Sequence, residues 1–574
     1  MGGATGEAVG GATAEAVGGA TAEAVGGATA EAGVGATAET VAGGMADTES
    51  KPNSQDTWLK SMFQMIFDKF ATLEKRIVGF ENSRQPKHED NEPSCASNSP
   101  KRIEMGAVQG PHVTTHKFFG ATYLLDQIGN KLGLIDDLKQ CFPENWNKLL
   151  SIAYFFILDD NSPLYMFEQW DKITKHPFNS NISSQRSSEI FSSITDEERY
   201  KFFRLQGDRR IETEYWAYDI TTISSYSKKL EQVQYGKNKE NDRLPQLNLA
   251  LLFGEDSGLP FYYRKLAGAI PDVKTIRILL HELNAFGFSN VKLAMDRGFY
   301  SAKNISDLFR EDLKFLVGVK KSTNFAKDAI ESALPQMWKY SLYNSNMNLY
   351  GVTVPGQWDY KEIEGNKESP SIQQPISMHV FYNNQMDIDE TNHFFKQIDQ
   401  LSNELISGKR KEMNEKSYGK YFKITMGHDS TIDITPNDEQ IFETRKDYGF
   451  VILLTNEKMD AFTAMKLYRA KDVAEKAFGH LKERLNMRRM LVSSELSLEG
   501  KLFVQFIALI LVSYINKKMH DNNIYRKYTM AKLLKKLNLI ECFEKPGFKM
   551  QLGEILKEQK EIYISLGIDP PESS

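Results

Sequence analysis

The sequence has little cysteine. Only three cysteines occur in 574 residues, Cys95, Cys141 and Cys542, and no Cys-x-x-Cys pair or Cys/His cluster is present. We therefore expect neither a disulfide framework nor a structural zinc site. This usage is typical of a reducing, intracellular compartment, and no stretch resembles a secretory signal peptide. The sequence predicts a cytoplasmic protein.

Long hydrophobic runs are also missing. The longest, Phe503 to Ile515, has 13 residues and includes a Gln and a Ser. A membrane-spanning helix needs about 20 apolar residues. We interpret the run as a buried core helix and expect no membrane partner.

The chain has no net positive charge: its 71 Lys and Arg are outnumbered by 76 Asp and Glu, and the net charge of −5 at first argues against nucleic acid as a partner. The charge is unevenly placed, however. Residues 1–45 contain five Glu and no Lys or Arg, whereas residues 482–536 contain 12 Lys or Arg and only four Asp or Glu. Phosphate contacts are made by local patches, so the basic stretch keeps DNA binding open.

The first 110 residues lack the pattern of a folded domain. Residues 2–41 repeat an eight-residue unit close to GGATAEAV five times, without aromatics, and we predict that residues 1–50 are disordered. Within 51–110, a heptad pattern from Asp56 to Phe80 indicates a helix followed by a linker. Self-association and packing on the protein's own body remain equal alternatives for this helix.

The remainder predicts a mixed α/β fold. Strand-like segments occur at 214–224, 247–253, 259–266, 291–296, 314–320 and 449–455, and helical segments at 273–286, 301–309 and 460–485. We predict an N-terminal helical domain (111–213), a first core segment (214–321), a β-rich insertion (322–445), a second core segment (446–515) and a C-terminal helical region (516–574).

Three acids are placed where they could converge. Asp219 lies within the first strand, Asp296 ends a later strand, and Glu475 lies on the helix over 460–485. Carboxylate oxygens suit Mg²⁺ or Mn²⁺ rather than zinc. Two such ions about 3.5–4 Å apart stabilise the attacking and leaving oxygens of phosphoryl transfer.

The helix over 460–485 carries a polar stripe beside its apolar face. At 100° per residue, Tyr468, Lys471, Glu475 and Lys482 fall within a stripe of about 60°. An acid flanked by cations and a phenol suits a site that cuts DNA. From the residues alone, a salt-bridged solvent face remains the alternative.

The spacing of these four residues matches Y-(2)-R/K-(3)-E-(6)-K, which resembles the signature of DDE transposases of the insertion-sequence-four type. Further blocks resemble this family in the same order: AYDITTISSYS (217–227), GLPFYYRKLAGAIPDVKT (258–275), MDRGFYSAKN (295–304) and GFVILLTN (449–456). The resemblance spans residues 145 to 515.

The resemblance implies an RNase-H-like mixed sheet, interrupted by a β-rich insertion and flanked by N-terminal and C-terminal helical regions. It implies that Asp219, Asp296 and Glu475 are catalytic and hold two Mg²⁺ or Mn²⁺ ions, with no small-molecule cofactor. The DNA-binding residues that we expect are Tyr468, Lys471, Lys482 and Arg297.

The chain departs from the family pattern at one position. Many relatives carry Arg where this chain has Lys471, and Lys loses the bidentate fork of the guanidinium group. Relatives also place a Trp of the insertion against a flipped base. Trp338 and Trp358 are both candidates for that role.

The function implied is cleavage of element ends and transfer of their 3′-OH groups to target DNA. The partners expected are double-stranded DNA and a second copy of the chain, in a nucleoid-associated, prokaryotic setting. Three alternatives stay open: a nuclease of the same fold without strand transfer, an inactive transposase-derived DNA-binding protein, and a structural protein led by the repeats.

Overall fold

The computed structural model describes residues 114–159, 162–209, 214–227, 230–236, 244–288, 290–366, 368–426, 432–485, 489–490, 494–545 and 547–572. The chain divides into two units, Met1–Gly106 and Ala107–Ser574. The repeat and the heptad helix predicted in the first unit lie outside the described residues. All that follows concerns the second unit.

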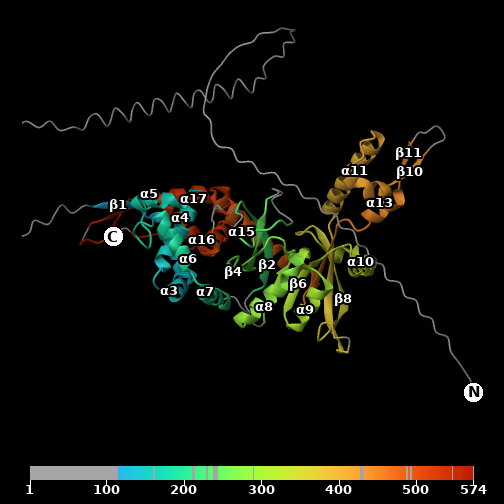
Figure 1. Ribbon diagram of the computed structural model, residues 1–574, viewed down its shortest axis with the longest axis horizontal. Helices are drawn as coiled ribbons and strands as arrows, with labels where there is room; N and C mark the ends of the chain where they lie inside the picture. Colours follow the sequence, from blue (N-terminus) through green and yellow to red (C-terminus); the bar gives the residue numbers. More distant parts are fainter. Residues whose placement is uncertain are drawn as a thin grey trace, which may run out of the picture. The chain divides into compact units, whose positions relative to one another are not determined.

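A ten-stranded mixed sheet forms the centre of this unit, in the order β4-β3-β2-β5-β6-β12-β9-β8-β7, with β13 paired to β2 (Figure 1). Only the β2–β5, β5–β6 and β13–β2 pairs are parallel. The strands are β2 (Trp216–Ser225), β3 (Gln246–Gly254), β4 (Pro260–Ala267), β5 (Lys292–Met295), β6 (Lys314–Val319), β7 (Tyr343–Asn344), β8 (Leu349–Lys361), β9 (Ser371–Tyr382), β12 (Phe450–Thr455) and β13 (Arg489–Met490). The predicted mixed α/β class is confirmed.

Helices cover both faces of the sheet, which explains why its central strands are apolar in near-continuous runs. On one face lie α8 (Ile276–Phe286), α9 (Ala302–Arg310) and α10 (Asn324–Met337); on the other lie α14 (Ala461–Ala470) and α15 (Asp472–Gly479). Phe309 of α9 packs against Phe315 of β6. Phe478 of α15 packs against Phe253 of β3 on the opposite face.

The helix predicted over 460–485 begins as expected, because Asp460 accepts hydrogen bonds from the backbone N–H groups of Phe462 and Thr463. It is not continuous, however. A turn at Lys471 separates α14 from α15, and η6 (His480–Arg484) is a π-helical turn. Lys471 keeps right-handed dihedral angles (φ −58°, ψ −19°), so the chain continues from α14 into α15 without reversing.

The segment between β6 and β12 contributes to the main sheet. β9 pairs with β12 from Tyr382 to Ser377, and β8 pairs with β9 along its length. This differs from an insertion that folds apart from the core: β9 covers the edge of β12 that would otherwise be exposed. The rest of the segment packs around its own small core and comprises α11 (Asn384–Ile406), α12 (Glu415–Tyr421), β10 (Phe422–Met426), β11 (Ile432–Pro436) and α13 (Asp438–Arg445).

A long buried helix, α16 (Glu495–Asp521), organises the helical part of the unit. By length and composition it could cross a membrane, but 89% of its apolar window is buried inside the protein, which confirms the predicted core helix. Gly500 lets α6 approach closely, because a Cβ there would lie 2.2 Å from the carbonyl oxygen of Phe191. The preceding helices are α2 (Gly120–Lys131), α3 (Leu134–Cys141), α4 (Trp146–Leu158), α5 (Phe167–Ile173), α6 (Ser184–Ser193) and α7 (Asp196–Asp208).

The two ends of the described chain fold together. β1 (Thr115–Phe118) pairs with β14 (Glu541–Glu544), which pairs with β15 (Gln551–Leu552). Two further C-terminal helices are α17 (Met530–Asn538) and α18 (Lys557–Ser565). Short 3₁₀ turns are η1 (Leu164–Met166), η2 (Asp272–Lys274), η3 (Arg297–Phe299), η4 (Tyr340–Leu342), η5 (Glu412–Asn414) and η7 (Ile524–Arg526).

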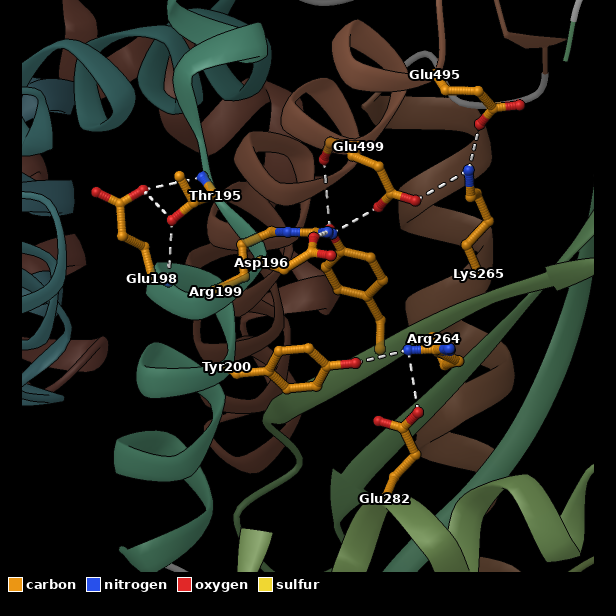
Figure 2. Close-up of polar contacts among 11 residues, drawn as sticks. Thr195, Asp196, Glu198, Arg199, Tyr200, Arg264, Lys265, Glu282, Glu495 and Glu499 are labelled. Atoms are coloured by element: carbon orange, nitrogen blue, oxygen red, sulfur yellow. Dashed lines mark hydrogen bonds and ion pairs between the residues drawn. The ribbon is translucent and has the colours of Figure 1, made fainter. Parts of the chain in front are cut away.

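Ion pairs join α7, the edge strand β4 and α16 (Figure 2). Arg199 pairs with Asp196 and Glu499, and Lys265 contacts both Glu495 (2.5 Å) and Glu499 (2.9 Å). The Arg199 and Lys265 side chains are only 12% and 7% exposed and that of Glu499 22%, so the two pairs with Glu499 are shielded from water, whereas Asp196 is exposed. The network therefore ties the N-terminal helices to the sheet.

Candidate functional site

Asp219 and Asp296 occupy adjacent positions on neighbouring parallel strands. β2 and β5 pair with Tyr218 opposite Met295, and each aspartate is the next residue along its strand. Asp296 keeps extended dihedral angles (φ −75°, ψ 163°), so the strand geometry continues through it. Paired residues of a sheet point to the same face. The sheet therefore brings together two acids that are 77 positions apart in sequence.

Each aspartate has local backbone contacts. Oδ1 of Asp219 accepts a hydrogen bond from the N–H of Ile220 at 2.7 Å, and the residue is half-buried. The carbonyl oxygen of Asp296 accepts from the N–H of Phe299, which closes the η3 turn after β5. Its side chain remains 43% exposed. Both acids are thus fixed at the backbone while part of the site stays open to solvent.

Helix α14 and the turn after it supply polar groups to Asp296. The hydroxyl of Tyr468 donates a hydrogen bond to Oδ1 of Asp296 at 2.6 Å. Nζ of Lys471 lies 3.8 Å from the same oxygen and 5.0 Å from the centre of the Tyr468 ring. Arg297 is exposed immediately after Asp296. Three of the four predicted DNA-binding residues therefore surround this carboxylate.

These contacts decide the charge state of Asp296. Burial alone would raise the pKa of its carboxyl group, but the Tyr468 hydrogen bond and the Lys471 and Arg297 charges outweigh burial and lower the pKa. The same arrangement raises the pKa of Tyr468, through burial and the neighbouring Asp296 charge. Asp296 is consequently an ionised acceptor and Tyr468 a neutral donor near neutral pH.

Gly318 of β6 makes room for this cluster, a role that sequence reasoning missed. The β5–β6 register, with Met295 opposite Val317, places Gly318 next to Asp296. A Cβ at position 318 would lie 2.7 Å from the Tyr468 hydroxyl and 3.0 Å from the Arg297 nitrogen. A glycine inside an otherwise apolar strand was the available signal, because such a glycine often marks a close approach.

Glu475 lies within α15, and its side chain falls outside what the structure describes. Its backbone is four residues after Lys471 and three before Phe478. Lys471 contacts Asp296, and Phe478 packs on Phe253 of β3. Because Phe253 pairs with Ala217 of β2, the α15 segment lies on the face of the sheet that carries Asp219. Lys482 lies further along, in the π-helical turn.

The acids present suit a hard divalent cation. Asp219 and Asp296 offer carboxylate oxygens side by side on the neighbouring strands β2 and β5, and oxygen is the donor that Mg²⁺ and Mn²⁺ prefer. Within the described part of the chain, no group of three or more His, Cys, Asp or Glu could hold a metal ion. The two aspartates would supply part of the oxygen ligand set that such a cation needs.

The two tryptophans lie in different environments. Trp358 is only 8% exposed, donates its Nε1–H to Ser306, and packs against Phe325. Trp338 is 53% exposed and packs edge-on against Tyr350 and Tyr382. β9 runs parallel to β6, each being antiparallel to β12, so Tyr382 and Asp296 lie at the same edge of the sheet. Trp338 is the exposed candidate at that edge.

These features define a mixed α/β protein with a polar, partly open acidic site where β5 ends beside the middle of the parallel strand β2. The chain belongs to the family of transposase DDE domains, whose model matches residues 213–511 and so includes Asp219, Asp296 and Glu475. By family it is a DNA transposase of the DDE class. The insertion-sequence-four type stays a prediction.

Comparisons with individual proteins identify similar solved structures. No curated protein matches the sequence. One similar solved structure is that of the piggyBac transposase synaptic complex with hairpin DNA, determined by cryo-EM. It shows 10% identity and a TM-score of 0.34, over 73% of this chain and 77% of that chain.

Proposed function

We propose that this transposase cleaves the ends of a DNA element and joins the freed 3′-OH groups to target DNA by two-metal phosphoryl transfer. Asp219, Asp296 and Glu475 are the proposed metal ligands. The observation that carries the proposal is the register of β2 and β5, which sets two carboxylates side by side on adjacent strands.

Glu475 is proposed as the third ligand because of where its helix lies. Glu475 lies between two contacts that hold its helical segment against the face of the sheet that carries Asp219. Lys471 lies near Asp296 on one side, and Phe478 packs on Phe253 on the other. A carboxylate on that turn has the right chemistry to complete an oxygen ligand set. The strand order β4-β3-β2-β5-β6, with three antiparallel strands followed by two parallel ones, supports an RNase-H-like core.

Bound divalent ions would supply charge stabilisation for the attacking and leaving oxygens. The chain's own residues would hold and orient the DNA. Lys471 and Arg297 place positive charge beside Asp296, and the Tyr468 hydroxyl can donate to a phosphate oxygen as it now donates to the carboxylate. Lys482, further along the same helical segment, is proposed to contact further phosphates of the DNA backbone.

Trp338 is the better of the two candidates for a base contact. An exposed indole can stack on an unpaired base, whereas the buried Trp358 is already engaged with Ser306 and Phe325. We also propose that two copies act together, since both ends of an element must be cut and joined in one event.

The test uses labelled duplexes carrying the ends of the element, with Mg²⁺, and compares the wild type with Asp219→Asn, Asp296→Asn and Glu475→Gln. We expect each variant to lose cleavage by several orders of magnitude while still binding DNA. Asp359→Asn, which alters an exposed carboxylate on β8, serves as the control and should cleave normally. Pre-cleaved ends test joining: an enzyme that nicks but never joins is a nuclease.

A further inference from the structure

The C-terminal part of the chain presents a second basic surface, formed by elements other than those that carry the aspartates. It consists of α17 and the hairpin β14–β15. The N–H groups of Phe119 and Gly120 donate to the Ile540 carbonyl at 2.8 and 3.1 Å, and the Tyr563 hydroxyl donates to the carbonyl of Gly120 at 2.7 Å. These contacts seat α17 and the hairpin firmly against the N-terminal helices.

Helix α17 is strongly two-sided. Its apolar residues are buried against α2, α16 and α18, namely Met530, Leu533, Leu534 and Leu537. Lys532 and Lys535 are exposed on the other side, three residues apart and therefore on one face. Leu539, just past the helix end, is 66% exposed. The helix thus exposes these two lysines to solvent on one face.

The tip of the hairpin also exposes positively charged side chains. Lys545 and Lys549 are exposed on either side of Phe548, which is itself 66% exposed. Nζ of Lys545 lies 4.6 Å from the centre of the Phe548 ring. Gly547 has φ +82°, a left-handed value that permits the tight turn. An exposed aromatic ring between two lysines is suited to the backbone and groove of DNA.

Three nearby acids have partners other than these lysines. Glu558 pairs with Lys527 and Lys536, Glu544 with Lys175, and Glu541 with His116. In the described part of the chain, no ion pair involves Lys532, Lys535, Lys545 or Lys549. The four lysines consequently keep a net positive potential toward solvent.

We propose that α17 and the β14–β15 hairpin form a second DNA-binding surface, which grips the phosphate backbone of duplex DNA through these four lysines and Phe548. The proposal rests on the proposed function in that DNA is the substrate. It assigns DNA contact to a region of the chain beyond the DDE family match, which ends at residue 511.

The experiment measures binding of the full-length chain to fluorescent duplexes by anisotropy, with a chelator present so that nothing is cut. One duplex carries the element end and one an unrelated sequence. Lys532→Gln/Lys535→Gln and Lys545→Gln/Lys549→Gln should each weaken binding several-fold. The dependence of log Kd on log salt should fall by about 1 for each contacting lysine. Weaker binding to both duplexes indicates that the surface binds the DNA backbone regardless of sequence. Weaker binding to the element-end duplex alone assigns the surface to the element end.

Lys409→Gln/Lys416→Gln is the matched control, because it removes two exposed lysines from another part of the fold. It should leave Kd unchanged; an equal loss there would show a general charge effect and overturn the proposal. Phe548→Ala is a second probe that keeps all charges and should also weaken binding. If both lysine pairs and Phe548 can be replaced without effect, the surface is not a DNA site. Failure of the proposed function is distinct, because the wild type would then not cut DNA with Mg²⁺.

Discussion

The hydroxyl of Tyr468 lies 2.6 Å from Oδ1 of Asp296 and donates a hydrogen bond to it, although 172 positions separate the two residues. Tyr468→Phe removes this donor and leaves the ring in place. We expect the pKa of Asp296 to rise, because the hydrogen bond is a main cause of its lowered value. The acid limb of the cleavage rate should then move to higher pH, as measured by rate–pH profiles. Tyr340→Phe, at a tyrosine that is 90% exposed, should leave the profile unchanged.

Gly318→Ala places a methyl group against the Tyr468 hydroxyl and the Arg297 backbone. Overpacking of this kind costs about 1–3 kcal/mol of stability. The cleavage rate should fall by more than the loss of folded protein explains, because Tyr468 is displaced from Asp296. Adding Tyr468→Phe should recover part of the lost stability in a double-mutant cycle, and strictly additive effects would contradict the steric explanation. Gly419→Ala, where a Cβ meets nothing within 4 Å, is the control.

Replacing the two tryptophans one at a time should affect different properties: the stability of the fold in one case and the cleavage activity in the other. Trp358→Ala removes a buried ring and should lower the free energy of unfolding by about 3–5 kcal/mol. Trp338→Ala should change stability little and reduce cleavage of duplex ends. Chemical denaturation and a cleavage assay check both expectations. A Trp338 variant with full activity would remove that residue from the proposed DNA contact.

The core strands could be predicted because they are runs of apolar and β-branched residues, as in 247–253 and 449–455. The pairing of β9 with β12 could not, since it depends on which distant segments meet. For the site, residue types and spacing indicated Asp219, Asp296 and Tyr468. The adjacency of the two aspartates and the space at Gly318 follow from strand register, which a single sequence does not specify. The break at Lys471 left no composition signal.

The contribution of His379 to stability should fall as the pH is lowered from about 6.5 to about 4. Burial lowers the pKa of His379 to about 4, with a smaller opposing effect from Asp460. The unfolded chain therefore binds a proton in this window while the folded chain does not, which costs up to roughly 3 kcal/mol. Burial also lowers the pKa values of His176 and His480, in the same direction. Denaturation at several pH values should show a shallower dependence in His379→Gln, and an identical slope would contradict this account.

Arg199→Met tests the network that joins α7 to α16. The shielded Arg199 side chain contacts Glu499 and the Tyr263 hydroxyl, so its loss leaves polar groups poorly compensated. Removing one member of a buried pair costs about 3–5 kcal/mol when the other charge is left uncompensated, and the remaining ion pair of Glu499 with Lys265 should keep the cost at or below the lower end of that range. Lys139→Met breaks an exposed pair with Asp136 and should cost about 0–1 kcal/mol. Equal melting temperatures for the two variants would show that the shielded network contributes no more than a surface pair.

β6 and β12 are direct neighbours in the sheet, yet some 130 residues separate them along the chain. Between Val319 and Phe450 the polypeptide adds β7, β8 and β9 to the sheet and forms α11–α13, and β12 then returns beside β6. Lengthening or trimming the excursion at α11–α13 would consequently leave the spacing of the acids untouched. The size of this segment can therefore vary in evolution without altering the sheet that positions the two aspartates.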